Sequence, residues 1–239
     1  MGIEPPKSSF DHFSTHYEEH LKDPLKEWIG GNSSEYYLQL KARETLEHLK
    51  RLSLDPKRLK VLEVGCGTGR VARMLHGEFL ELSGVDSSQG MIQRARSSPP
   101  PGVSFYASDA GRLPFEDGRF DFLYSMCLFH HVPHRFHPDI LREMLRVLKP
   151  GGWTFHFEHN ALNPLTRLVV KRCPVDEGVR LLYPHRMADL FRRQNLRQIH
   201  TRFILFFPKY FRFLRRGEPR LSWLPLGGQF YVCGRKSAP

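Results

Sequence analysis

Residues 57–75, KRLKVLEVGCGTGRVARML, decide the expected fold of this chain. An apolar run at 61–64 leads directly into three glycines between Gly65 and Gly69, and a helix-like pattern follows. Glu63 stands inside the apolar run, although the burial of an unpaired carboxylate is costly. Because glycines let a backbone approach a ligand closely, the stretch predicts a strand, a binding turn and a helix.

The bulk composition predicts one ordered α/β domain. The chain has 239 residues, of which 40% are hydrophobic and 26% are charged, as in globular proteins of this size. Its net charge of +11 suits nucleic acid, an anionic membrane surface or an acidic ligand, and charge alone does not choose between them. No run approaches the roughly 18–20 apolar residues of a membrane span and no signal-peptide core is present, so we expect a cytoplasmic location.

The four cysteines, Cys66, Cys127, Cys173 and Cys233, are far apart and include no C-x-x-C pair. This spacing predicts reduced thiols, and neither a zinc site nor a disulfide framework. The 13 histidines do not pair as H-x-x-x-H beside an acid on one expected helix, so no metal is expected.

Strand-like and helix-like runs alternate along the middle of the chain. We expect strands at 61–64, 79–86, 103–108, 120–126 and 153–160, and helices at 70–75, 88–97 and 138–152. Such alternation predicts right-handed crossovers and a mostly parallel sheet. A helix at 184–194 is then followed by two strands, within 199–208 and 229–236, which suggests an antiparallel hairpin at the sheet edge.

The N-terminal part reads as helical. Aromatic and charged residues at 8–31 suit short amphipathic helices, and the Asn32 to Glu35 stretch resembles a capping box. Apolar residues from Leu38 to Leu52 then recur at three- or four-residue spacing, which predicts a helix with one apolar face.

Acidic and small polar residues stand where the expected strands end, which is where open α/β sheets bind ligands. Asp86 ends the second strand and is placed to accept hydrogen bonds from ribose hydroxyls. The alternative role of Asp86, a cap for the next helix, could be filled by Ser87 or Ser88. The E-V-G-C-G-T-G spacing is tighter by one residue than the dinucleotide pattern, so a ligand without phosphate fits better.

The glycine pattern resembles motif I of the class I S-adenosylmethionine-dependent methyltransferases. Within that class, the chain resembles the methyltransferases of type 11. The resemblance continues through GVDSSQGMI, SDAGRLPFEDGRFDFLYSM, FHHV and LREMLRVLKPGG, at 84–92, 108–126, 129–132 and 141–152. It implies a Rossmann-like, seven-stranded, mostly parallel sheet in the order 3-2-1-4-5-7-6, with helices on both faces and an antiparallel final strand. It also implies a helical N-terminal lid at 1–52 and a catalytic core at 53–239, with acceptor-side insertions at 161–183 and 209–228.

The same resemblance implies a site for S-adenosylmethionine. Glu63 and the glycine loop would surround the methionyl part, Asp86 would bind the ribose, and Asp109 would accept from the adenine amino group. The residues expected to bind the cofactor are Tyr17, Glu63, Gly65, Gly67, Gly69, Asp86, Ser87, Met91, Asp109, Ala110, Ser125 and Met126. Tyr17 resembles the lid tyrosine of such enzymes, although a plain core or surface role fits it equally well.

The expected activity is in-line methyl transfer to an oxygen or nitrogen of a small molecule, which needs a well-placed acceptor and no metal. His131, and after it His130, could serve as a general base, or both could have packing or capping roles. One alternative is an acceptor held in a membrane, such as a lipid or polyprenyl compound. Another, from a different class, is a nicotinamide-dependent enzyme or a nucleotide-binding module without catalysis.

The acceptor side is expected at residues that follow the fifth strand. The candidates for substrate binding are Glu158, His159, Asn160, Asn163 and Arg167, with a solvated loop as the alternative. The segment 201–228 interleaves aromatic residues with arginines. Those aromatics could roof the acceptor pocket or lie on an anionic membrane, and nucleic acid is the least favoured partner because no RNA-binding module is recognised. The oligomeric state is left open.

Overall fold

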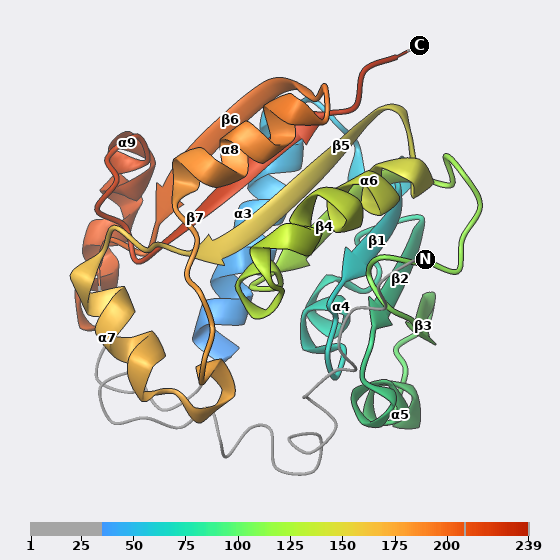
Figure 1. Ribbon diagram of the computed structural model, residues 1–239, viewed down its shortest axis with the longest axis horizontal. Coiled ribbons are helices and arrows are strands. Elements are labelled where there is room, and N and C mark those ends of the chain that lie inside the picture. Colours follow the sequence, from blue (N-terminus) through green and yellow to red (C-terminus); the bar gives the residue numbers. More distant parts are fainter. Residues whose placement is uncertain (1–34, 208, 239) are drawn as a thin grey trace.

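The computed structural model describes residues 35–207 and 209–238. The short helices expected at 8–31 and the expected lid residue Tyr17 lie outside this range. Within it, one sheet is covered by helices on both faces (Figure 1). Among the described residues, every helix is too short or too polar to cross a membrane.

The sheet has seven strands in the order β3-β2-β1-β4-β5-β7-β6. Their bounds are β1 Lys60–Val64, β2 Glu81–Asp86, β3 Val103–Ala107, β4 Phe120–Met126, β5 Leu148–His159, β6 Arg197–Ile204 and β7 Gln229–Arg235. The first five strands pair in parallel, and β7 pairs antiparallel with both β5 and β6. The predicted fold class and strand order are confirmed.

Two apolar cores lie on opposite faces of the sheet because neighbouring strand residues point to opposite sides. On β4, Phe122 and Tyr124 belong to one core, and Leu123 belongs to the other. The first core includes α3 Glu35–Arg51, α4 Arg70–Leu75 and α5 Gln89–Ser97. The second includes α6 His137–Val147 and α8 Pro184–Arg193, which lie in front of the sheet in Figure 1.

The predicted helix after the capping box is α3, and its buried face is more polar than the apolar spacing suggests. Lys41, Thr45 and His48 are buried on it together with Ala42 and Leu49. The His48 ring stacks on Phe155 of β5, with 4.7 Å between ring centroids. The expected boundary between lid and core at residue 52 stays a proposal.

The structure has helices in both expected acceptor-side insertions, 161–183 and 209–228. They are α7 Pro164–Arg172, the 3-10 turn η5 Pro174–Asp176, the 3-10 segment η6 Lys209–Gly217 and α9 Glu218–Leu221. Helix α7 begins because Asn163 accepts a hydrogen bond from the Thr166 N–H (2.9 Å) and Pro164 occupies the first turn.

One predicted boundary also differs. Helix α6 ends at Val147, and β5 already begins at Leu148, before Pro150 and the two glycines that follow it. A proline cannot continue a helix without losing a backbone hydrogen bond, so the chain leaves the helix before it.

Candidate active site

A single cavity of about 500 Å³ opens at the carboxyl ends of the parallel strands. Its walls come from the loops after β1, β2, β3 and β4, and from α3, α7 and the residues around η5. The volume is within the usual range for small-molecule sites. Sheet topology predicts a ligand site at this edge, and the cavity lies there.

The glycine loop between β1 and α4 forms one wall of the cavity. Gly65 and Gly67 line it. A Cβ built on Gly67 would have no described atom within 4 Å, so this position faces open space. Gly69 does not line the cavity: its φ is +75° and a Cβ there would lie 2.5 Å from the Phe105 ring. Gly69 therefore permits close packing of the loop on β3.

Asp86 connects the ends of the first two strands. Its Oδ2 accepts a hydrogen bond from the Gly67 N–H (2.8 Å) and its Oδ1 accepts one from the Ser88 N–H (2.9 Å). Ser88, in turn, caps α5 by accepting from the Met91 N–H at 3.2 Å. The Asp86 carboxylate thus fixes the glycine loop while it still lines the cavity.

Glu63 is buried at the cavity wall, next to the Tyr124 hydroxyl, which donates to its Oε2 at 3.2 Å. Burial raises the pKa of Glu63 to about 8, and the nearby Asp86 adds to the shift. At neutral pH the carboxyl group is therefore largely protonated in the ligand-free protein. A cation beside it would favour its ionised form.

Most of the residues predicted to bind the cofactor meet in this cavity. Those that line it are Glu63, Gly65, Gly67, Asp86, Ser87, Met91, Asp109, Ala110 and Met126. Ser125 does not: it is buried, and its Oγ lies 2.7 Å from Nδ1 of His156. Alternation along β4 turns Ser125 away from the side on which Met126 lies.

The residues present fit S-adenosylmethionine. Asp86 and Asp109 supply carboxylate acceptors for ribose hydroxyls and an amino group, and Met91 and Val85 supply apolar surface beside them. The open face at Gly67 leaves room for a ligand close to the backbone. When bound, this cofactor supplies an electrophilic methyl group on a sulfonium.

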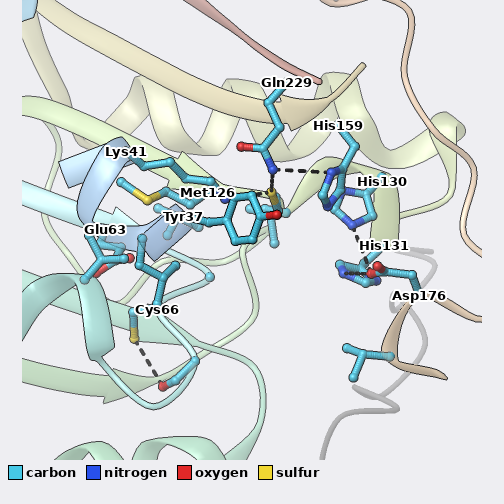
Figure 2. A pocket seen from close by; sticks show the side chains of 18 of the residues that line it. Tyr37, Lys41, Glu63, Cys66, Met126, His130, His131, His159, Asp176 and Gln229 are labelled. Carbon is cyan, nitrogen blue, oxygen red and sulfur yellow. Dashed lines mark hydrogen bonds and ion pairs between the residues drawn. The ribbon is translucent and has the colours of Figure 1, made fainter. Parts of the chain in front are cut away.

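The other half of the cavity holds a cluster of polar side chains from five separate parts of the chain (Figure 2). Its members are Lys41 of α3, Cys127 after β4, His130 and His131 of η3 Phe129–His131, His159 of β5, Asp176 of η5 and Gln229 of β7. The Lys41 Nζ lies 3.1 Å from Cys127 Sγ, and Gln229 Nε2 lies 3.3 Å from His159 Nδ1.

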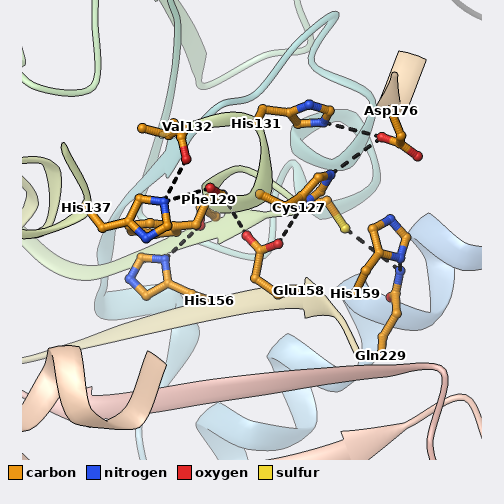
Figure 3. A network of polar contacts seen from close by, with 12 residues as sticks. Cys127, Phe129, His131, Val132, His137, His156, Glu158, His159, Asp176 and Gln229 are labelled. Atoms are coloured by element: carbon orange, nitrogen blue, oxygen red, sulfur yellow. Dashed lines mark hydrogen bonds and ion pairs between the residues drawn. The ribbon is translucent and has the colours of Figure 1, made fainter. Parts of the chain in front are cut away.

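A chain of ionisable groups runs through this cluster (Figure 3). His130 Nδ1 is 2.6 Å from Glu158 Oε2, and its Nε2 is 3.5 Å from Asp176 Oδ1. His131 Nε2 is also 3.5 Å from that Asp176 oxygen. One carboxylate therefore faces two imidazoles.

The two imidazoles have opposite protonation states. Burial disfavours a charged His130, but Glu158 and Asp176 outweigh this effect and raise its pKa to about 10. Burial and the neighbouring His130 lower the pKa of His131 to about 3, in spite of Asp176. At neutral pH His130 is thus an imidazolium, and His131 is a neutral imidazole.

The residues predicted to bind substrate divide into two groups. His159 and Asn163 line the cavity. Glu158 lies behind His130 and is fully buried, and Arg167 is exposed outside the lining. Asn160 is also buried, and its Nδ2 donates to the carbonyls of Pro225 and Gly227 (3.0 and 2.8 Å). Asn160 therefore holds a loop in place and does not face the cavity.

Sequence reasoning missed Lys41, Cys127, Asp176 and Gln229. Lys41 had a signal, because it shares a helix face with Thr45 and His48 at three- or four-residue spacing. Cys127 has a φ of +59°, in the region that non-glycine residues rarely occupy, which no sequence pattern reveals. Asp176 and Gln229 reach the site only through long-range folding.

Among the described residues, His130, His131 and Asp176 offer ligand atoms within 4.8 Å of one another, a spacing that could hold a metal ion. Charge pairing already explains the same arrangement, because the His130 imidazolium lies between two carboxylates.

Comparison with known proteins adds to this description. Residues 61–152 match the family model described as a methyltransferase domain. The chain is similar to the chloroplastic tocopherol O-methyltransferase of Arabidopsis thaliana, with 30% identity over 161 residues, or 57% of this chain and 46% of the relative. It is similar to the 2-methyl-6-phytyl-1,4-hydroquinone methyltransferase of Synechocystis, with 37% identity over 100 residues, or 41% of this chain and 31% of the relative.

A solved structure shares the fold over nearly the whole chain. It is an S-adenosylmethionine-dependent methyltransferase of Thermotoga maritima, described as a possible histamine N-methyltransferase, with a TM-score of 0.66 and 22% identity. The match covers 95% of this chain and 98% of that one. The alignments span less than half of the length of both curated relatives. Residues 61–152 therefore match a methyltransferase domain, and the strand order is the one expected for class I S-adenosylmethionine-dependent methyltransferases.

Proposed function

We propose that this protein transfers the methyl group of S-adenosylmethionine to a hydroxyl oxygen of an apolar small molecule. One observation carries the proposal: a single cavity joins the half that holds Asp86 and Asp109 to the half that holds His130 and His131. A methyl donor in the first half and an acceptor in the second would share one enclosure. Proximity of that kind is the main requirement for displacement at a sulfonium methyl.

The walls of the acceptor half support an apolar acceptor. The apolar residues that line it are Leu38, Leu165, Val169, Val175, Leu205, Phe206 and Phe207. These side chains exclude water around the reacting atoms. Relatives named for tocopherol and for a phytyl hydroquinone support a hydroxylated aromatic compound with an apolar tail.

The polar cluster would remove the acceptor's proton. The neutral His131 would accept it, and Asp176 would hold the ring and stabilise the imidazolium that forms. Glu158 would keep His130 charged and in place. The positive charges of His130 and Lys41 favour a hydroxyl or phenolate acceptor, and they disfavour a protonated amine. We therefore prefer oxygen to nitrogen as the methylated atom.

Isothermal titration calorimetry is the first test. We expect S-adenosylmethionine to bind and NAD not to bind, and tight NAD binding alone would instead support a nicotinamide enzyme or a nucleotide-binding module. Asp86→Asn should weaken cofactor binding at least about tenfold, the loss expected for one or two hydrogen bonds to a charged group. An unchanged dissociation constant would remove Asp86 from the site.

Acceptors would then be screened with the cofactor-loaded protein. The measurement is a mass gain of one methyl group on pairs of alkylated phenols and matched alkylated anilines. Methylation of the phenols is expected, and methylation of the anilines alone would overturn the choice of oxygen. We place the reaction in the cytoplasm because all four cysteines are free thiols, as a reducing compartment favours.

A further inference from the structure

The surface beside the cavity mouth is both basic and apolar. We name residues 162–172, 202–207 and 209–226 the basic rim; they include α7, η6 and α9. The basic rim contains nine lysines and arginines and one acidic residue, Glu218, which gives a net charge of +8 against +11 for the whole chain. Glu218 is itself buried. Most of the chain's excess positive charge is therefore concentrated in a small part of its sequence.

The basic rim also exposes most of the large apolar side chains that face solvent. Among the described residues ten large hydrophobic side chains are exposed, and eight of them belong to the basic rim. They are Leu162, Leu165, Leu168, Phe211, Phe213, Leu214, Trp223 and Leu226. Phe213 and Trp223 are 69% and 68% exposed. Such a concentration is unusual for a surface that faces only water.

Hydrogen bonds connect residues 162–172 to the rest of the basic rim. Asn163 Nδ2 donates to the Leu226 carbonyl (2.7 Å), and Thr166 Oγ1 donates to the Gly228 carbonyl (2.8 Å). These bonds hold the start of α7 against the chain that follows α9. In Figure 1 both helices lie on the side of the molecule where β5 ends.

The basic rim continues into the cavity. Leu165 and Val169 of α7, and Phe206 and Phe207 before η6, line the acceptor half. The described aromatics of 201–213 have three kinds of surroundings, and one of them, Phe203, is buried in the core. Phe206 and Phe207 roof the cavity, and Phe211 and Phe213 are exposed outside it.

We propose that the basic rim docks the protein on an anionic lipid bilayer, with the cavity mouth at the membrane surface. Arginines are attracted to anionic headgroups, and exposed Phe, Trp and Leu side chains insert at the interface. Basic residues alone, or exposed apolar residues alone, would not point to a bilayer. An anionic bilayer has both a negatively charged surface and an apolar interior directly beneath it. If the proposed function holds, an apolar acceptor would enter the cavity directly from the membrane.

Vesicle co-sedimentation tests this docking without any need for an acceptor. The intact chain would be mixed with phosphatidylcholine vesicles that contain phosphatidylglycerol and with vesicles of phosphatidylcholine alone. Binding to the anionic vesicles is expected, with at least a tenfold loss in 0.5 M salt through screening. Equal binding to both vesicles, or no binding to either, would overturn the proposal.

Matched variants locate the docking surface. Phe213→Ser with Trp223→Ser should weaken vesicle binding at least tenfold, whereas Leu80→Ser should not, although Leu80 is 62% exposed. Arg216→Glu with Arg220→Glu should also weaken vesicle binding at least tenfold. Arg58 is exposed as well, but Arg58→Glu should leave vesicle binding unchanged. Leu80 and Arg58 precede β2 and β1, at the amino ends of the parallel strands, whereas the cavity lies at the carboxyl ends.

Calorimetric binding of S-adenosylmethionine would show that each variant is folded, and it separates a failure of docking from a failure of the proposed function. If the rim variants bind anionic vesicles as tightly as the unaltered protein does, the proposal is wrong. A single-stranded RNA that binds in place of vesicles would assign the basic rim to nucleic acid. If the protein does not bind vesicles but forms a dimer, and the same variants dissociate that dimer, the basic rim would instead bind a second copy of the chain.

Discussion

Asp176 contacts two histidines that differ in charge, and this asymmetry defines the chemistry of the polar cluster. Its oxygen lies 3.5 Å from Nε2 of both His130 and His131. His130 is also bonded to Glu158 and holds a proton firmly, whereas the carboxylate that faces His131 is Asp176. Burial, and after it the nearby positive His130, keeps His131 neutral. Its low pKa makes His131 a weak base by itself, and Asp176 would orient the ring and stabilise the charge that it gains on accepting a proton.

We therefore expect Asp176→Asn to lower kcat about 10- to 100-fold, less than the roughly 100- to 10,000-fold that general base catalysis contributes, because Asp176 acts through His131. The dissociation constant of S-adenosylmethionine should not change, since Asp176 lies in the acceptor half. The neighbouring exposed Glu177→Gln serves as the control and should retain full activity. A fall in kcat that is equal in both variants, or weaker cofactor binding in Asp176→Asn, would argue against the assigned role.

At the scale of elements, the glycine loop shows why only some glycines face the ligand. Gly67 opens to the cavity, and Gly69 instead lets the loop pack on β3. Both have positive φ, so the sequence motif reflects backbone conformation as well as ligand access.

Gly69→Ala should lower the free energy of unfolding by about 2–4 kcal/mol, from the left-handed backbone and from overpacking against Phe105. Gly77→Ala is a matched control: its φ is also +75°, but its Cβ would have no described atom within 4 Å. That control should cost only about 1–2 kcal/mol. Chemical denaturation measures both values, and equal losses would show that contact with Phe105 is unimportant.

The sequence predicts periodic elements well and irregular ones poorly. The strands around Glu63 and Asp86, and hence most of the cofactor half, follow from alternating patterns and one motif. Helix α7 is short, and its side chains lie partly on the exposed surface, so its apolar spacing is not distinctive. Asp176 meets His131 only because η5 returns to the end of β4, and no local pattern contains that contact.

At the scale of the whole molecule, buried ionisable groups should give stability a maximum near pH 6.5. Among the described residues, burial lowers the pKa of five histidines: that of His48 to about 4, those of His131, His156 and His159 to about 3, and that of His137 below its ordinary value. Between those values and about 6.5 the unfolded chain binds more protons, so stability rises with pH. Glu63 and His130 have raised pKa values, about 8 and about 10, so their contributions are lost as pH increases through those values.

Thermal unfolding between pH 5 and pH 9 should therefore show a rise, a maximum and a fall. Each group that titrates changes the stability by about 1.4 kcal/mol per pH unit within its window. Glu63→Gln should flatten the decline between pH 6.5 and pH 8, because it removes one of the two groups that titrate there. A decline of the same slope in this variant would mean that Glu63 does not hold its proton in the folded protein.

Cys127 lies at the turn where β4 ends, beside Lys41 and inside the cavity wall. It is partly exposed, whereas Cys66, Cys173 and Cys233 are buried. An alkylating reagent such as iodoacetamide should therefore modify Cys127 first, and peptide mass spectrometry would identify the labelled site. A fluorophore attached there would report when the enclosure fills, without any knowledge of the acceptor's identity.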